Sequence, residues 1–432
     1  MVHERPEFKK FMEKNLPNSE FHLDLEIIAN PPKEYIKDFF AQLKKHKQYD
    51  KLKDDFIYDS ELNIFAQIHN RFPFSDIEDL STEEVFFYPF MEKKDIKRIF
   101  TIKSSEDFLL RLRAEQIERN VRLKRTFSKL KKKFGQDYSF LNHFETHQYK
   151  NYLKNLKPEY KEKCLNIPHG TIHSKEANGM CLNTPFGNII VLSYGLRHFL
   201  FYMNVFYFGR QLGMEFHERL EAFVLAIRIM IGTESFDFEL DPRAKFPKSI
   251  KKKIDVRTDW QMLFIVGHEY AHHYLGHVGK SKTINLHRKV EFITAPSSFY
   301  NYSQVSEFEA DKNSILNTVY HDDEQAELIN GAFLFFIYLD LYEKVEDYLF
   351  PKRNQIQTHP QPLERLWKLR SEIADKIGLD PDDLKTIIAD NSDFINGFLE
   401  EFLPYNVEAI ETIGSVYITK YRKKILIDRL DF

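Results

Sequence analysis

Residues Trp260–His277 read WQMLFIVGHEYAHHYLGH. This segment carries the strongest indications in the sequence of both the fold and the chemistry of the protein. The chain holds 17 histidines in 432 residues, and four of them fall in this one segment. Its apolar residues recur at three- and four-residue steps, which predicts an amphipathic helix. Thr258 or Asp259 is suited to cap the start of that helix, and Gly279 is suited to end it.

Two of these histidines, His268 and His272, are four positions apart and share one face of the predicted helix. This spacing suits two ligands of a single zinc ion. Glu269 lies one step round the helix, where its carboxylate can reach a water molecule at the zinc without displacing it. His273 faces another direction, as a packing or surface residue. The alternative is a histidine-rich core helix whose imidazoles are satisfied by hydrogen bonds.

A third ligand is expected on a second helix, which begins in the segment SEFEADK at residues 306–312. Glu307 and Asp311 are four apart and share a face, so Glu307 is predicted to bind the metal. Asp311 is predicted to accept the outer imidazole N–H of a ligand histidine. Glu309 points roughly opposite Glu307 and is the less favoured ligand. An ordinary solvated acidic helix start is the alternative.

The composition limits the kind of metal site. The sequence has 62 basic and 65 acidic residues, a net charge of −3, and only two cysteines, Cys164 and Cys181. Two cysteines exclude a disulfide scaffold and a cysteine-rich zinc module. A tightly bound metal must therefore rest on histidine and carboxylate, which suits a catalytic site better than a structural one.

The apolar runs, of which Phe199–Phe208 and Ala332–Leu339 are the longest, are far shorter than the roughly 20 residues of a membrane helix. The charged N-terminal stretch lacks the apolar core of a secretory signal. No membrane span and a cytoplasmic location are therefore expected.

The predicted fold is α+β and mostly α, in three parts. Residues 1–160 form a helical N-terminal region, 161–375 a zincin-like metallopeptidase domain with a small sheet, and 376–432 a C-terminal helical extension. Within the second part, the β-branched run at 188–193 predicts a strand that follows a turn at 184–187. Helices are predicted next, over 194–212 and from about 215 to 231. A Pro- and Lys-rich connector is expected to follow, including Lys251–Lys253.

Residues 105–134 are predicted to form one long helix that is rich in positive charge. Between Arg111 and Lys133 there are ten Lys or Arg residues and two Glu. A solvated helix face packed on its domain is the favoured interpretation. The alternative is a surface for nucleic acid or an acidic partner, which salt-dependent binding would reveal.

The motifs resemble those of the gluzincin peptidases of the HtpX and CAAX prenyl protease type. Four features carry the resemblance, which covers roughly residues 180–372: His268-Glu269-x-x-His272 with His277, Glu307-Phe308-x-Ala310-Asp311, Thr358-His359-Pro360 followed by Glu364-Arg365-Leu366, and the strand and helix at 187–212. His277 is expected beside the metal ligands. It is not the third ligand of the HExxHxxGxxH pattern, because Leu275 and Val278 stand where that pattern has glycine and histidine.

The resemblance implies a Zn²⁺-dependent endopeptidase that acts on a protein or peptide. His359 is the candidate donor to the oxyanion, or it covers the zinc in a resting state. The predicted strand at 188–193 would be an edge strand along which an extended substrate pairs. Because no membrane span is expected, the chain is also similar to cytosolic peptidases of the ImmA type, which cleave repressors, and of the Lit phage-exclusion type, which cleave a translation factor. These imply a role in regulation or phage defence.

A zinc-containing regulatory or binding protein without peptidase activity is the competing interpretation. Such a site is usually closed by a fourth protein ligand, for which His277 and His359 are the candidates.

Overall fold

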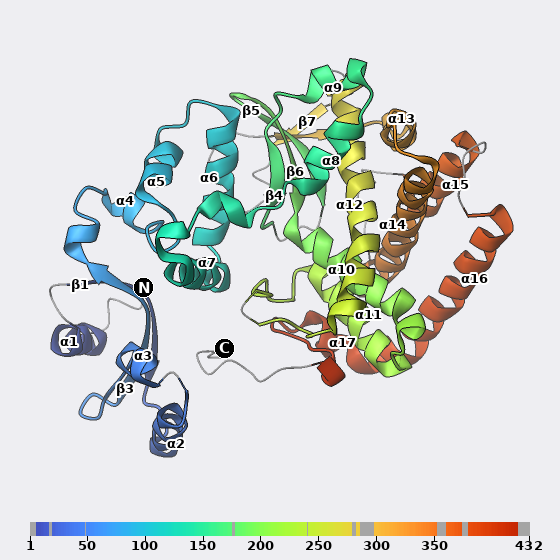
Figure 1. Ribbon diagram of the computed structural model, residues 1–432. Coiled ribbons are helices and arrows are strands. Elements are labelled where there is room, and N and C mark those ends of the chain that lie inside the picture. Colours follow the sequence, from blue (N-terminus) through green and yellow to red (C-terminus); the bar gives the residue numbers. More distant parts are fainter. Residues whose placement is uncertain are drawn as a thin grey trace. The chain divides into compact units, whose positions relative to one another are not determined.

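The computed structural model is mostly helical and contains two small sheets (Figure 1). This confirms the predicted mixed class in which helices outweigh strands. The residues that the structure describes are 6–16, 20–47, 49–174, 178–239, 241–278, 282–285, 298–351, 360–373 and 379–421. The chain divides into two compact units, and each contains one of the sheets.

The first unit comprises the described residues up to 101 together with 117–140, and the second comprises 102–116 with 141–421. These limits differ from the predicted ones at 160 and 375, both of which lie inside the second unit. The chain enters the second unit before residue 160 because α8 (His147–Asn155) and α9 (Pro158–Cys164) pack against its long central helix.

The first unit contains a sheet in addition to helices, so the predicted helical N-terminal region describes only part of its structure. Its three antiparallel strands have the order β1-β3-β2, with bounds β1 (Glu20–Ala29), β2 (Phe56–Asp59) and β3 (Ile64–Pro73). Successive side chains of a strand face opposite sides. Ile64 and Ala66 therefore pack on α1 (Pro6–Asn15), whereas Phe65 packs on α2 (Lys33–Lys44) beside Phe39. Proline and aromatic breaks hid the alternating pattern.

The helix expected over 105–134 is two helices, α6 (Ser105–Glu118) and α7 (Val121–Phe134). The chain breaks at Asn120, whose side-chain oxygen accepts a hydrogen bond from the backbone N–H of Leu123 and caps α7. Shorter helices complete this region of the chain: α3 (Tyr49–Leu52), α4 (Thr82–Val85) and α5 (Lys93–Phe100).

Much of the positive charge of this segment is used inside the protein. Arg125 donates to Asp24 over 2.9 Å, and Lys131 donates to the carbonyl oxygens of Tyr88 and Met91. Burial lowers the pKa of Lys131 to about 8. Arg113 is buried and donates to the carbonyl of Thr171. These contacts agree with a packed helix face and leave fewer cations for a nucleic-acid partner.

The second unit is built on a five-stranded sheet with the order β4-β6-β5-β8-β7. Its strands are β4 (His169–Ile172), β5 (Gly179–Thr184), β6 (Gly187–Ser193), β7 (Lys282–Asn285) and β8 (Ser298–Asn301). The predicted strand at 188–193 and its preceding turn are confirmed as β6 and the β5–β6 hairpin. Its predicted position at the sheet edge is wrong, because β6 pairs with β4 on one side and β5 on the other.

Ten helices among the described residues belong wholly to this second unit. Their bounds are α8 and α9 as above, α10 (Tyr194–Phe208), α11 (Phe216–Ile231), α12 (Lys248–Tyr274), α13 (Gln304–Leu316), α14 (Asp322–Leu349), α15 (Pro362–Glu372), α16 (Pro381–Gly397) and α17 (Leu403–Glu411). Residues of α6 pack on β4, β5 and β6, and α12 contacts β5 and β6. The helices predicted over 194–212 and 215–231 are confirmed as α10 with its final short turn and α11.

The central helix of this unit is α12, which contacts α8, α10, α13 and α14 (Figure 1). Gly331 of α14 lies against the backbone of Trp260, where a Cβ atom would approach the Trp260 carbonyl carbon to 3.0 Å. The absence of a side chain at Gly331 therefore lets the two longest helices cross closely.

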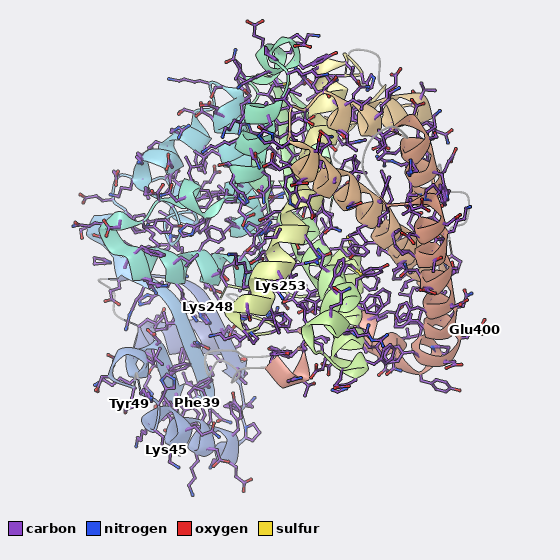
Figure 2. The ribbon with its side chains drawn as sticks, turned by 45° about the vertical axis from the view of Figure 1, so that its right-hand side comes forward. Phe39, Lys45, Tyr49, Lys248, Lys253 and Glu400 are labelled. Carbon is purple, nitrogen blue, oxygen red and sulfur yellow. The ribbon has the colours of Figure 1, made fainter. Side chains whose placement is uncertain are left out.

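The start predicted for this helix at Thr258 or Asp259 is wrong by ten residues. α12 begins at Lys248, directly after Pro247, and the exposed Lys248 and Lys253 lie on its first turns and not in a connector (Figure 2). Thr258 is buried in mid-helix and bonds Asn204. The helix ends at Tyr274, and the predicted stop residue Gly279 lies outside the described residues.

Within the described part of the chain, no helix combines the length and the apolar character that crossing a membrane requires. This agrees with the expectation from the short apolar runs.

Candidate metal centre

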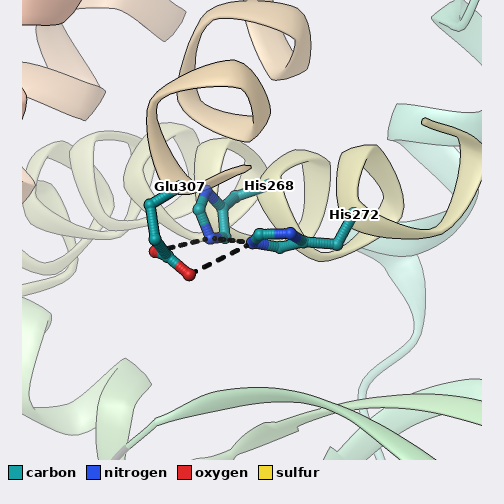
Figure 3. Close-up of side chains that lie close together, drawn as sticks. All are labelled: His268, His272 and Glu307. Atoms are coloured by element: carbon teal, nitrogen blue, oxygen red, sulfur yellow. Dashed lines mark hydrogen bonds and ion pairs between the residues drawn. The ribbon is translucent and has the colours of Figure 1, made fainter. Parts of the chain in front are cut away.

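Three side chains converge where α12 meets α13: His268, His272 and Glu307 (Figure 3). Their candidate ligand atoms all lie within 4.8 Å of one another. The Nε2 atoms of the two histidines are 3.0 Å apart, and the Glu307 oxygens lie 3.5 Å from His268 Nε2 and 3.4 Å from His272 Nε2. All three side chains are buried. The structure thus brings together the three residues that the sequence predicted as ligands.

Local sequence explains this convergence. The four-residue spacing puts both imidazoles on one face of α12. α13 begins directly after Ser303, whose side-chain oxygen accepts a hydrogen bond from the backbone N–H of Ser306. This cap fixes the start of α13, so Glu307 falls in its first turn, close to the histidines.

The donor set suits a zinc ion. Imidazole nitrogen and carboxylate oxygen are zinc ligands, and three protein ligands are typical of a catalytic zinc site. Both imidazoles present Nε2 to the same point, and each engages its Nδ1 elsewhere. This arrangement is the one that orients a metal-binding histidine.

His268 is supported by a buried ionic network. Its Nδ1 lies 2.8 Å from Asp311 Oδ1, and Arg365 of α15 bonds both oxygens of Asp311, over 2.8 and 2.6 Å. Arg365 also lies 3.4 Å from Glu307 Oε2. Asp311 therefore occupies the position predicted for it, next to the outer nitrogen of a ligand histidine.

The charges of this network compensate one another. Burial opposes a charge on Asp311, but Arg365 and the hydrogen bond to His268 outweigh it and lower the Asp311 pKa. Burial likewise opposes the protonation of His268, but Asp311 and Glu307 outweigh it and raise the His268 pKa. The carboxylates of Asp311 and Glu307 therefore favour positive charge at His268.

His272 has a different set of neighbours. Its Nδ1 lies 3.0 Å from Nδ1 of His277, and Nε2 of His277 lies 3.0 Å from Glu309 Oε2. The ring of Tyr302 stacks on His272 with a centroid separation of 3.5 Å. Burial, with the neighbouring His268, lowers the His272 pKa to about 3, so this ring stays neutral and keeps a lone pair for a ligand.

Glu269, the candidate base, is buried on the same helix and lies against the start of β5. A Cβ atom at Gly179 would come within 3.0 Å of Glu269 Oε1, so the glycine lets the strand approach the carboxylate closely. His268 and Glu269 line a cleft of about 440 Å³. Apolar side chains of α12 and α14, including Phe264, Phe335 and Leu339, form part of its wall.

Thr358 and His359 fall outside the described residues, so the predicted role of His359 stays a prediction. The hydroxyl of Tyr270 lies 3.1 Å from His169 Nδ1, and that of Tyr274 donates to the carbonyl of Asn313. Neither tyrosine is therefore turned toward the ligand cluster.

Sequence reasoning missed three supporting residues. Arg365 belongs to a recognised motif segment, but its pairing with Asp311 and Glu307 was not foreseen. Glu309 points away from the cluster, as expected, yet it reaches His277. Tyr302 is one of many tyrosines and carries no local signal. Ser303 is a residue type that favours the N-cap position, so the start of α13 could have been predicted from the sequence.

No protein-family model matches this chain, and searches of curated proteins and of solved structures found no significant similarity. The resemblance to the gluzincin peptidases therefore rests on the sequence motifs alone.

Proposed function

We propose that this chain is a zinc-dependent endopeptidase with a zincin-like domain, a hydrolase of the gluzincin kind. The observation that carries the proposal is the convergence of His268 Nε2, His272 Nε2 and the Glu307 carboxylate at one buried point, with Glu269 beside it in a cleft. Two facing histidines alone would also fit a packed core helix. The carboxylate from a second helix and the acid next to it are what a hydrolytic zinc site requires.

His268, His272 and Glu307 would hold the zinc ion. When bound, zinc supplies Lewis acidity, which makes water a nucleophile at neutral pH and polarises a carbonyl group. Glu269 is the general base, which accepts the proton of the attacking water and then delivers it to the leaving amine nitrogen. Its burial beside Gly179 holds its carboxylate at the cleft while keeping it off the ligand cluster.

The arrangement of His277 supports an enzyme over a closed structural zinc site. Structural zinc sites usually have four protein ligands. His277 was a candidate fourth ligand, but its two ring nitrogens face His272 Nδ1 and Glu309, on the side of His272 away from the ligand atom Nε2. Among the residues that the structure describes, only three ligands gather at this point.

The cleft supports a polypeptide substrate. Its lining combines apolar side chains with Gly179, the first residue of β5, and the preceding Asn178. The motifs are similar to those of the cytosolic ImmA and Lit types, which favours an intracellular protein substrate and a role in regulation or phage defence. A substrate strand would not add at β6, because both sides of β6 are already paired.

Replacing Glu269 with Gln tests the proposal. The variant should keep its zinc, because Glu269 is not a ligand, and should lose at least about 100-fold in peptide hydrolysis, the scale of general-base catalysis. New protein N-termini would be compared by mass spectrometry in cell extracts treated with wild type, Glu269→Gln and a control, Glu327→Ala, at an exposed site of α14. Cleavage products shared by wild type and Glu269→Gln, and absent from untreated extract, would refute the assigned base.

A further inference from the structure

We infer that Glu309 and His277 act together as a positioning pair. They keep the hydrogen of the His272 ring on Nδ1, so that Nε2 of His272 is the atom available to a metal. The inference rests on the proposed function. It assigns a role to Glu309, an exposed carboxylate that is not a metal ligand, and to His277, which accepts a hydrogen bond at Nδ1 and donates one from Nε2.

The two imidazole rings and the Glu309 carboxylate form a short chain of hydrogen bonds. His272 Nδ1 lies 3.0 Å from His277 Nδ1, and His277 Nε2 lies 3.0 Å from Glu309 Oε2. His277 is buried, with 4% of its surface exposed, whereas the Glu309 side chain is 56% exposed. These hydrogen bonds therefore connect the buried ligand His272 to the solvent-exposed Glu309.

Counting protons along this chain leaves one arrangement that allows metal binding. A neutral imidazole carries its hydrogen on one nitrogen and a lone pair on the other. A carboxylate can only accept, so His277 donates from Nε2 to Glu309 and carries a lone pair on Nδ1. His272 must then donate from its Nδ1 to that lone pair, which leaves its Nε2 free of hydrogen and able to bind zinc.

Without the carboxylate the opposite arrangement becomes equally good. His277 could then carry its hydrogen on Nδ1 and donate to His272 Nδ1. His272 would hold its own hydrogen on Nε2, where it would block the metal. Glu309 thus acts on His272 indirectly, through His277, by determining which tautomer of His272 is favoured. Tyr302 holds the plane of the His272 ring by stacking, but stacking cannot distinguish the two tautomers.

Each of the two ligand histidines is therefore connected to a carboxylate, one directly and the other through a second histidine. His268 meets its carboxylate, Asp311, directly at 2.8 Å. His272 reaches a carboxylate only through His277. Both carboxylates come from α13, two residues apart, and the turn of the helix between them places one on each side of the metal ligands.

The test measures zinc affinity, by competition with a chromophoric chelator, in the full-length chain. The variants are Glu309→Ala, Glu309→Gln and the control Glu327→Ala. We expect Glu309→Ala to bind zinc about tenfold more weakly, at the low end for an outer hydrogen-bond partner. Glu309→Gln should recover most of the affinity, because an amide oxygen can still accept from His277. Glu327→Ala should match the wild type.

A second readout is the ¹⁵N NMR spectrum of zinc-loaded protein labelled at histidine. It should show His272 protonated at Nδ1 and His277 protonated at Nε2. Zinc affinity unchanged in Glu309→Ala, or the reverse tautomers, would overturn the positioning pair and leave the proposed function intact. A wild-type chain that binds no zinc would instead overturn the proposed function itself.

Discussion

The two histidines of the candidate metal centre are alike in sequence but are supported in opposite ways. On one side, His268 bonds Asp311, which Arg365 holds with two further hydrogen bonds, and all of these side chains are buried. On the other side, His272 contacts His277, and that contact ends at Glu309, which is mostly exposed. The first support is a closed ionic network, and the second is a short chain of hydrogen bonds open to solvent.

Because of this difference, substitutions on the two sides can separate an effect on folding stability from an effect on metal binding. A buried charge that loses its partner costs several kcal/mol of folding free energy. An exposed carboxylate costs little when removed, because water replaces its contacts. We therefore expect the His268 side to control both stability and metal binding, and the His272 side to control metal binding almost alone.

The largest effect on stability is expected from Arg365→Met. The substitution leaves Asp311 and Glu307 buried without their cation, and we expect the protein to lose about 3–5 kcal/mol of unfolding free energy. Urea unfolding of the metal-free protein measures this loss. Arg370→Met, on the same helix and partly buried, is the control. A loss below about 1 kcal/mol at Arg365 would mean that the network does not stabilise the fold.

The largest effect on metal affinity from a residue that is not a ligand is expected from Asp311→Asn. The amide keeps an oxygen beside His268 but loses the charge that Arg365 and His268 share, so we expect zinc binding to weaken 10- to 100-fold. Chelator competition gives the value. We expect the larger loss of zinc affinity in Asp311→Asn, because Asp311 contacts its histidine directly. A smaller loss of affinity than in Glu309→Ala would contradict this order.

A smaller effect is expected from Ser303→Ala, at the start of the helix that carries both carboxylates. Loss of the cap should cost about 1 kcal/mol of stability. Thermal unfolding would show it, with the exposed Val305→Ala as the matched control. Equal melting temperatures for Ser303→Ala and wild type would indicate that the cap does not hold the start of α13.

The smallest effect on stability is expected from Glu309→Ala, within about 0.5 kcal/mol of the wild type. Urea unfolding without metal measures it under the same conditions as Arg365→Met. A loss comparable to that of Arg365→Met would remove the contrast between the two sides and would make the exposed contact a structural one.

The sequence predicted this site where its signals are local. The four-residue spacings on α12 and α13 set which face each side chain occupies, so His268, Glu269, His272, Glu307 and Asp311 could be placed without tertiary information. The support of the site could not be predicted in the same way. Arg365 meets Asp311 across 54 positions of the chain, and nothing in either local pattern indicates the pairing.

The same limit explains the errors in the fold. β1 and β3 pair across more than 30 residues, and the breaks between them masked their alternation. The first turns of α12 are polar and rich in lysine, so they gave no apolar pattern before residue 258. β6 was recognised as a strand from its own residues, but its neighbours in the sheet depend on segments far away in sequence.

The most direct test of the central claim is the zinc content of the purified protein, measured by mass spectrometry after dialysis against a weak chelator. The proposed ligand set predicts one zinc per chain in the wild type and in Glu269→Gln, and none in Glu307→Ala. It also predicts one zinc in Glu309→Ala when zinc is supplied in excess. Wild-type zinc content in Glu307→Ala would contradict the account, because the ligand set of His268, His272 and Glu307 could then not be the one that holds the metal.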